Sequence, residues 1–137
     1  MRSIVREFGW PDYEAVLRLW AETGLKLGPS ESREGIALKL DRDPDLFLLA
    51  QAEGDVAGAV LGAFDGRRGW IYHLAVRPDR QRQGIGHELL TEVERRLRAK
   101  GCLKINLLIE PGSAGAAVFY ERLGYREIGR ASCRERV

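Results

Sequence analysis

The residues with the clearest chemical potential form a basic turn between an apolar run and a helix-like segment. Two glycines stand one residue apart in this turn and three arginines accompany them: Gly84, Gly86, Arg77, Arg80 and Arg82. A helix N-terminus offers unpaired N–H groups and the positive end of its dipole, and glycine lets a ligand approach the backbone closely. The pattern indicates a site for a phosphate or pyrophosphate. An ordinary strand-to-helix turn with solvated arginines has the same composition.

Length and composition are those of one soluble globular domain over residues 1–137. The chain has 45% hydrophobic and 31% charged residues and a net charge of +2, which argues against nucleic acid or an anionic membrane as the main partner. No segment has the apolar core of a signal peptide or the ~20 apolar residues of a membrane span, so we expect a cytoplasmic protein. Cys102 and Cys133 have no histidine at ligand spacing, which predicts no metal site, and we expect Cys102 to be a buried hydrophobe.

The elements that must position this turn follow from periodicity. Strands are predicted at 3–8, 46–50, 56–64, 71–76 and 105–109. Helices are predicted after Pro11-Asp12, from Ser30 to Asp43-Pro44, at 85–100 and at 116–123. Gly58 and Gly62 lie inside a predicted strand and suggest a bulge or close packing. The order β-α-α-β-β-β-α-β-α-β predicts an α/β (α+β) fold with one mixed sheet and helices on both faces.

Three segments together resemble a known family. They are Leu74-Ala75-Val76-Arg77-Pro78, Gln81-Arg82-Gln83-Gly84-Ile85-Gly86, and Ala116-Ala117-Val118-Phe119-Tyr120-Glu121-Arg122-Leu123-Gly124-Tyr125. In this order they resemble the acyl-CoA and helix-four signatures of the GNAT superfamily of N-acetyltransferases. The segment 64–101 is most similar to small bacterial members of the YpeA type.

The resemblance implies acetyl-CoA as co-substrate and assigns residues to it. The pyrophosphate would lie on the backbone of a loop formed by Gln81, Arg82, Gln83, Gly84, Ile85, Gly86 and His87. Leu74 and Val76 would lie along the pantetheine, and Tyr120 would face the CoA sulfur as a hydrogen-bond donor to the leaving thiolate. Ser113 stands where many relatives carry Asn, and it retains the ability to cap the helix and reach the CoA chain.

The acceptor end is less specified. Tyr72, Glu110 and Asn106 are its polar candidates, with Tyr72 and Glu110 as possible catalytic partners of Tyr120. Strand alternation predicts that Tyr72 shares a face with Leu74 and Val76, while His73 points the opposite way as a packed or surface residue.

The end of the chain departs from the family. From about Ile128 it resembles the in-frame translation of a common sequencing adapter, so we expect residues of about 127–137 to be non-native. Family members end with a strand beside the fifth, but this segment lacks an alternating apolar pattern. We therefore expect the final strand to be missing and the fifth strand to keep an unpaired edge.

The function expected from this reading is transfer of an acetyl group from acetyl-CoA to a primary amine, on a small molecule or a protein, by direct attack. The alternative is a non-catalytic CoA-binding sensor or regulatory module. A nucleotide or nucleic-acid binder is a third class, but the chain lacks the Gly-Lys-Ser/Thr of a Walker loop and the third glycine of a dinucleotide fold. The acceptor and the oligomeric state, a dimer included, stay open.

Overall fold

The computed structural model describes residues 3–108, 114–127 and 133–136. Along the chain they form β1 (Ser3–Glu7), η1 (Trp10–Asp12), α1 (Tyr13–Glu22), η2 (Pro29–Glu31), α2 (Arg33–Arg42), β2 (Phe47–Ala52), β3 (Asp55–Phe64), β4 (Arg68–Val76), η3 (Pro78–Arg80), α3 (Ile85–Ala99), β5 (Lys104–Leu108), α4 (Ala114–Arg122), β6 (Arg126–Glu127) and β7 (Cys133–Arg136). The predicted order of elements is confirmed. The second helix is shorter than predicted: Ser32, rather than Ser30, caps α2 by accepting from the Gly35 N–H at 3.1 Å.

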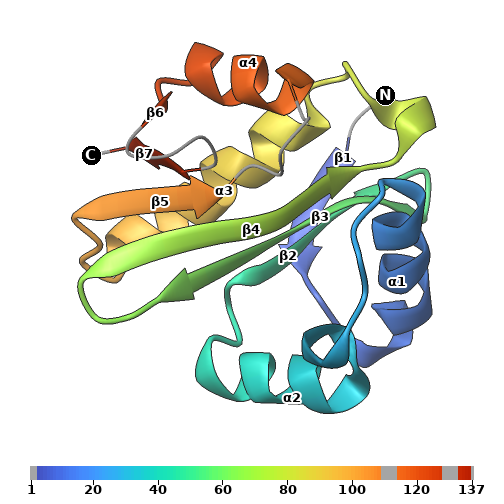
Figure 1. Ribbon diagram of the computed structural model, residues 1–137. Helices are drawn as coiled ribbons and strands as arrows, with labels where there is room; N and C mark the ends of the chain where they lie inside the picture. Colours follow the sequence, from blue (N-terminus) through green and yellow to red (C-terminus); the bar gives the residue numbers. More distant parts are fainter. Residues whose placement is uncertain (1–2, 109–113, 128–132, 137) are drawn as a thin grey trace.

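One mixed sheet runs through the molecule, with strand order β1-β2-β3-β4-β5-β7-β6 (Figure 1). Strands β1 to β4 are antiparallel neighbours, and β5 is parallel to β4 because α3 connects them as a crossover. These relations confirm the predicted mixed sheet.

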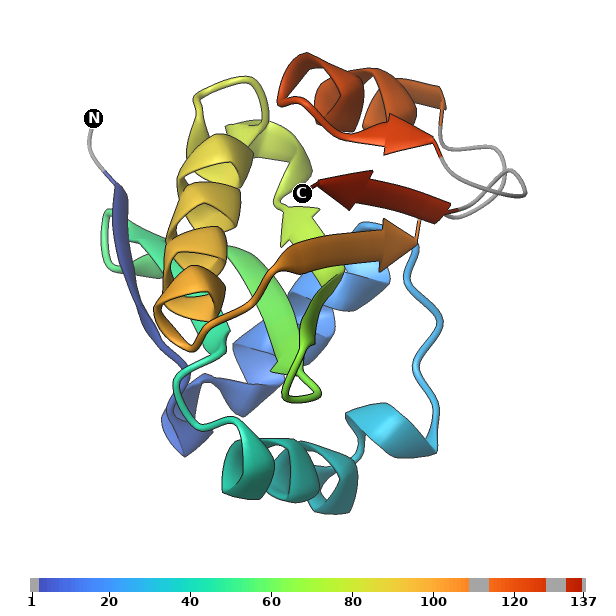
Figure 2. The same cartoon turned by 90° about the vertical axis from the view of Figure 1, so that its left-hand side faces the viewer.

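Helices cover both faces of the sheet, as predicted (Figures 1 and 2). On one face, α1 and α2 pack on a core that contains Trp20, Ile36, Phe47 and Leu61. On the other face, α3 and α4 share a core with the sheet. Gly58 and Gly62 explain how closely α3 approaches: an added Cβ would lie 2.9 Å from the Leu89 side chain at Gly58 and 2.7 Å from Val93 at Gly62. The expected close packing is confirmed.

A bulge in β4 changes the direction of two functional side chains. The β3–β4 register shifts between Ala59 and Leu61, and His73 has φ +54°, a left-handed backbone conformation uncommon for a residue with a Cβ. Tyr72 therefore packs with the α1 and α2 core, whereas Leu74 and Val76 pack with the α3 core. The prediction that Tyr72 shares a face with Leu74 and Val76 is wrong, because regular alternation does not continue through a bulge. His73 lies opposite Leu74 and Val76, as predicted, but on the same face as Tyr72, where its ring contacts Trp20.

The carboxyl-terminal part of the chain contains the last strand after all. β7 pairs antiparallel with β5, from Ile105 opposite Arg136 to Leu108 opposite Cys133, and β6 pairs with its other edge. The expectation of a missing strand and an unpaired β5 edge is wrong. Strand pairing uses backbone N–H and C=O groups, which a segment without apolar alternation still supplies.

Candidate active site

A cavity of about 830 Å³ lies between the end of β4, the start of α3 and helix α4. Its lining contains nine of the residues predicted to bind the cofactor: Leu74, Val76, Gln81, Arg82, Gly84, Ile85, Gly86, His87 and Tyr120. Gln83 does not line it, and Ser113 lies outside the described residues. The structure thus brings residues of the turn and of α4, more than 30 positions apart in the chain, around one space.

The turn before α3 has the backbone geometry of an anion-binding loop. Arg82 has φ +66° and Gly84, the N-cap of α3, has φ +86°. An added Cβ on Gly84 would meet no atom within 4 Å, so the backbone there faces open space. Because the first N–H groups of a helix have no intrahelical acceptor, those following Gly84 are available to a phosphate.

The arginines around this loop differ in their surroundings. Arg77 forms an ion pair with Asp79 at 2.7 Å, and Arg80 forms one with Glu53 at 2.8 Å. Arg82 lines the cavity. Arg122 of α4 lines it as well, so the positive charge that reaches this cavity comes from Arg82, Arg122 and the N-terminus of α3.

Gly86 keeps the cavity open toward α4. A Cβ added there would lie 3.3 Å from the Phe119 ring and 3.7 Å from Val76. Gln81 supports the same wall, because its Nε2 donates to the Val76 carbonyl at 3.1 Å.

Tyr120 closes the far side of the cavity from α4. Its side chain is buried, and its ring makes edge contacts with Phe119 and Tyr125. Burial raises the pKa of the Tyr120 hydroxyl well above its ordinary value. The hydroxyl therefore stays protonated near neutral pH and can act as a hydrogen-bond donor to a group in the cavity.

Strands β4 and β5 are hydrogen-bonded only over the first half of β4. The paired residues run from Arg68 opposite Lys104 to Ile71 opposite Leu107. In the described part of the chain, Tyr72 to Val76 have no partner on β5. This edge of β4 is available to an extended ligand, which would pair with it as an added strand does.

The opposite face of this opening holds Tyr72, one of the predicted acceptor residues. Tyr72 is half-buried, and its pKa is raised by burial and by the charges of Asp43 and Glu31. The Lys39 ammonium lies 5.7 Å from the centre of the Tyr72 ring and 2.8 Å from Asp43. Tyr72 thus lies between charged groups on the α2 side of the sheet.

Asn106 and Glu110 are the other two predicted candidates for the acceptor end. Asn106 is 1% exposed, and its Oδ1 has no hydrogen-bond partner among the described residues. Glu110 lies outside the described residues.

Cys102 is a free, buried thiol whose Sγ donates to the Lys104 carbonyl at 3.1 Å, which confirms the expected buried cysteine.

Sequence reasoning missed Glu31. Its carboxylate lies 3.0 Å from His73 Nε2, although the two residues are 42 positions apart. The local signal is slight: Glu31 follows Pro29 in a short turn that any solvated loop also contains. His73 could not be placed because its bulge has no marker in the sequence.

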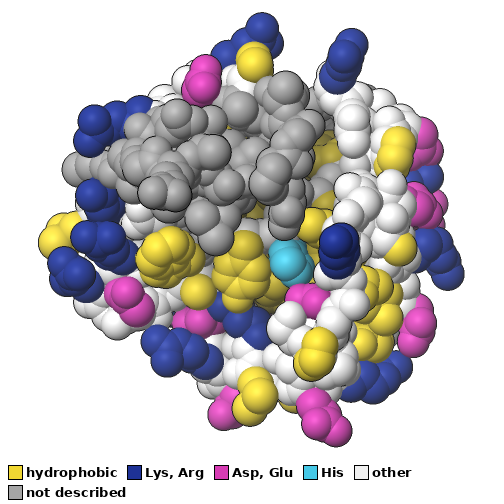
Figure 3. Space-filling model, viewed as in Figure 1, with side chains coloured by type: hydrophobic (Ala, Val, Ile, Leu, Met, Phe, Trp, Pro, Cys, Tyr) yellow, Lys and Arg dark blue, Asp and Glu magenta, His cyan; other side chains and the backbone are white. Residues whose placement is uncertain are grey.

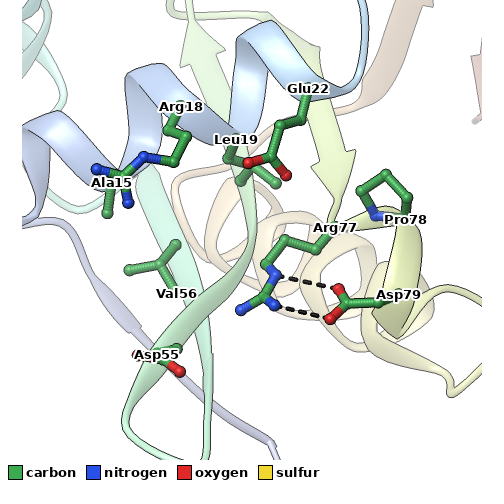
Figure 4. A pocket seen from close by; sticks show the side chains of 9 residues that line it. All are labelled: Ala15, Arg18, Leu19, Glu22, Asp55, Val56, Arg77, Pro78 and Asp79. Carbon is green, nitrogen blue, oxygen red and sulfur yellow. Dashed lines mark hydrogen bonds and ion pairs between the residues drawn. The ribbon is translucent and has the colours of Figure 1, made fainter.

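A second pocket of about 490 Å³ lies at the end of α1, beside the beginning of β3 and the turn at Pro78. Figure 4 shows the side chains of Arg77 and Asp79 turned toward each other in its wall. Arg18, Glu22 and Asp55 also line it. Because it carries charges of both signs and none of the residues around Tyr120, it is distinct from the cavity described above.

The surface in the view of Figure 1 is mixed. Hydrophobic side chains gather in the middle of this face, with basic and acidic side chains around them (Figure 3). Among the described residues, no helix has the length and apolar character needed to cross a bilayer.

Known proteins resemble this chain in sequence and in fold. The profile of the acetyltransferase (GNAT) family matches residues 6–125. An acetyltransferase of Pectobacterium atrosepticum is 38% identical over 124 residues, covering 90% of this chain and 88% of that protein. The fold is similar to those of Ard1 from Thermoplasma volcanium (TM-score 0.88, 20% identity, 99% and 97% coverage) and of PaiA N-acetyltransferase from Thermoplasma acidophilum, solved with coenzyme A (TM-score 0.85, 20% identity, 99% coverage of both chains). The resemblance found in the three sequence segments is confirmed, and the chain is an acetyltransferase that belongs to the GNAT family.

Proposed function

We propose that this acetyltransferase moves the acetyl group of acetyl-CoA to a primary amine by direct attack, without a covalent enzyme intermediate. One observation carries the proposal: a single cavity joins the positive-φ loop, the edge of β4 that has no strand partner among the described residues, and the buried Tyr120. Their order matches the order of pyrophosphate, pantetheine and thioester in acetyl-CoA. The similarity of the segment 64–101 to YpeA-type members supports a place among these small bacterial enzymes.

The donor would lie along the cavity. The backbone N–H groups after Gly84 and the Arg82 guanidinium hold the pyrophosphate. Leu74 and Val76 contact the pantetheine from β4. This arrangement directs the thioester toward Tyr120, at the point where β4 and β5 cease to pair.

In the chemical step, the amine nitrogen forms a bond to the thioester carbonyl carbon. The C–S bond then breaks, and the electron pair leaves on the CoA sulfur as a thiolate. A phenol of pKa ~10 would transfer its proton to a thiolate of pKa ~8.5 at a cost of about 2 kcal/mol, and burial of Tyr120 increases that cost. Tyr120 therefore stabilises the thiolate by donating a hydrogen bond, and full proton transfer comes late or from solvent.

A direct route is supported by the surroundings of the described cysteine. Cys102 is buried under α3, with its thiol bonded to a backbone carbonyl. No histidine accompanies it in the described structure, so it lacks the base that an acyl-cysteine route requires.

A thiol-release assay tests the proposal. Acetyl-CoA is incubated with the full chain and an amine panel of lysine, spermidine, an aminoglycoside and an alanine-initiated peptide, and released CoA thiol and acetylated product are quantified. We expect thiol and product in equal amounts for at least one amine. Binding of acetyl-CoA without thiol release for any amine would favour the non-catalytic CoA sensor instead.

A further inference from the structure

Glu31 and His73 form a partly buried pair on the acceptor face of the sheet, which is the face that α1 and α2 cover. His73 Nε2 lies 3.0 Å from Glu31 Oε2, and the two side chains are 22% and 10% exposed. Glu31 comes from the turn between α1 and α2, whereas His73 is the bulge residue of β4. The pair therefore joins the loop over the acceptor face to the strand that borders the cofactor cavity.

The Glu31 carboxylate is held in place by several donors. Its Oε1 accepts the Gly28 N–H at 2.8 Å, and its Oε2 accepts the Ser30 hydroxyl at 2.5 Å. The Tyr13 hydroxyl donates to the Glu31 carbonyl at 2.8 Å and fixes the turn. Burial acts to raise the pKa of Glu31, but the hydrogen bonds from Ser30, His73 and Gly28 outweigh it and lower that pKa overall. Glu31 is thus a fixed carboxylate.

The His73 ring is oriented by its neighbours. It makes edge contacts with Trp20, at 5.0 Å between ring centres, and with Tyr72, at 5.4 Å. Because Nε2 faces a carboxylate, the neutral ring carries its hydrogen on Nε2. Nδ1, which has no hydrogen-bond partner among the described residues, keeps its lone pair available.

His73 lies on β4 next to the place where the acyl group of the donor would lie. Ile71 is the last residue of β4 that pairs with β5, and Leu74 lines the cofactor cavity with Tyr120. His73 lies between them and projects to the opposite face because of the bulge. An acyl group at the end of the paired region would have Tyr120 on one face of the sheet and His73 on the other.

We propose that Glu31 and His73 act as a dyad that receives the proton of the acceptor amine. This inference rests on the proposed acetyl transfer. As the amine nitrogen bonds to the carbonyl carbon, His73 Nδ1 takes one N–H proton, directly or through a water, and becomes an imidazolium. Glu31 holds the ring orientation and stabilises that positive charge, and the imidazolium then returns the proton to solvent or to the departing thiolate.

The other groups near Glu31 and His73 do not compete with His73 as acceptor of the amine proton. From α2, Lys39 and Asp43 reach Tyr72, and Lys39 is engaged by Asp43 and by the Gly62 carbonyl. From α1, the residue that contacts the ring is Trp20, which is not titratable. From the turn before α2, Glu31 is the titratable contact. Among these groups, the His73 imidazole is the one whose second ring nitrogen has no hydrogen-bond partner in the described residues, which leaves this nitrogen to accept a proton.

The test compares the wild type with Glu31→Gln and His73→Gln in the full chain. Using the amine of the panel that gives the fastest wild-type thiol release, kcat and KM are measured at one fixed pH. We expect each variant to lose about 10²-fold in kcat/KM, while the Kd for CoA stays within about twofold. Glu14→Gln, at an exposed ion pair with Arg33 on the same side of the molecule, is the matched control and should retain wild-type kinetics.

Nitrogen NMR of the imidazole provides a reading that needs no acceptor. The wild type should show the Nε2–H form, and Glu31→Gln should shift the ring toward a mixture of tautomers. Variants that keep the wild-type kcat/KM, with only a lower Tm, would overturn the dyad and leave acetyl transfer standing. A wild type that releases no thiol with any amine would overturn the proposed function and the dyad together.

Discussion

Ile71 of β4 is paired with Leu107 of β5, and in the described part of the chain this is the last pair between the two strands. Two residues later, His73 forms the bulge that sends Leu74 and Val76 to the α3 face and Tyr72 to the α1 face. Beyond Ile71, this edge of β4 has no partner among the described residues of β5. The bulge places different side chains on the two faces of this part of the strand. In the proposed function, the same strand therefore carries the donor on one face and the acceptor on the other.

Tyr120→Phe should slow acetyl transfer without weakening donor binding. The ring, which is buried among Phe119 and Tyr125, is retained, and only the hydroxyl that donates to the thiolate is lost. We expect kcat to fall by about 10²-fold and the Kd for acetyl-CoA to stay within about twofold, measured by thiol release and calorimetry. Tyr125→Phe is the matched control, because its hydroxyl bonds Glu94 on the outside of α3. Equal kcat in wild type and Tyr120→Phe would remove Tyr120 from the mechanism.

Gly84→Ala should raise the Kd for CoA, and its loss of folding stability alone should not account for this increase. At φ +86° an added Cβ costs about 1–2 kcal/mol of stability, and it also projects where the pyrophosphate would lie. Gly54→Ala is a close control, with φ +85° in a hairpin turn and nothing within 4 Å of its Cβ. Urea unfolding should show similar losses for both, and calorimetry should show a Kd increase of at least about tenfold for Gly84→Ala alone. Equal CoA affinity in the two variants would contradict the loop assignment.

Gly62→Ala should destabilise the fold through overpacking. The new Cβ would lie 2.7 Å from the Val93 side chain and 3.5 Å from that of Leu46, where α3 packs on the sheet. Overpacking of this kind costs about 1–3 kcal/mol, so we expect a lower free energy of unfolding in urea. The double variant Gly62→Ala/Val93→Ala should recover part of that loss, and a double variant with purely additive losses would argue against direct contact.

Acid should weaken the fold through Glu92. Its hydrogen bond with Arg95, supported by Arg96, lowers the pKa of this carboxyl to about 2. A lowered carboxyl pKa contributes stability above the unfolded value near 4.5, and this contribution is lost as the pH falls toward 2. Solvent screening reduces it to about 1 kcal/mol. Urea unfolding near pH 4.5 and near pH 2 should show that acid lowers the free energy of unfolding less for Glu92→Gln than for the wild type. Glu14→Gln should behave as the wild type does.

The sequence predicted well which residues surround the cavity, but it predicted poorly the side chains on the opposite face of the sheet, for physical reasons. Gly84 and the apolar spacing of α3 are local signals, and the cavity forms where these signals place it. His73 and Glu31 depend on a one-residue bulge and on a turn 42 positions away, and neither has a period that can be counted. The last strand was missed because the pairing of β7 with β5 relies on the backbone, whereas the prediction relied on side-chain alternation.

Amide NMR with CoA tests most directly the claim that CoA lies along β4 with its pyrophosphate at the N-terminus of α3. Backbone N–H signals of the described residues are followed in the full chain as CoA is added. We predict the largest shifts at Arg82 to His87 and at Leu74 to Val76, with little change at Ala15, Arg18 and Glu22 in the second pocket. Shifts concentrated at the second pocket, or no shift at Arg82 to His87, would contradict the account.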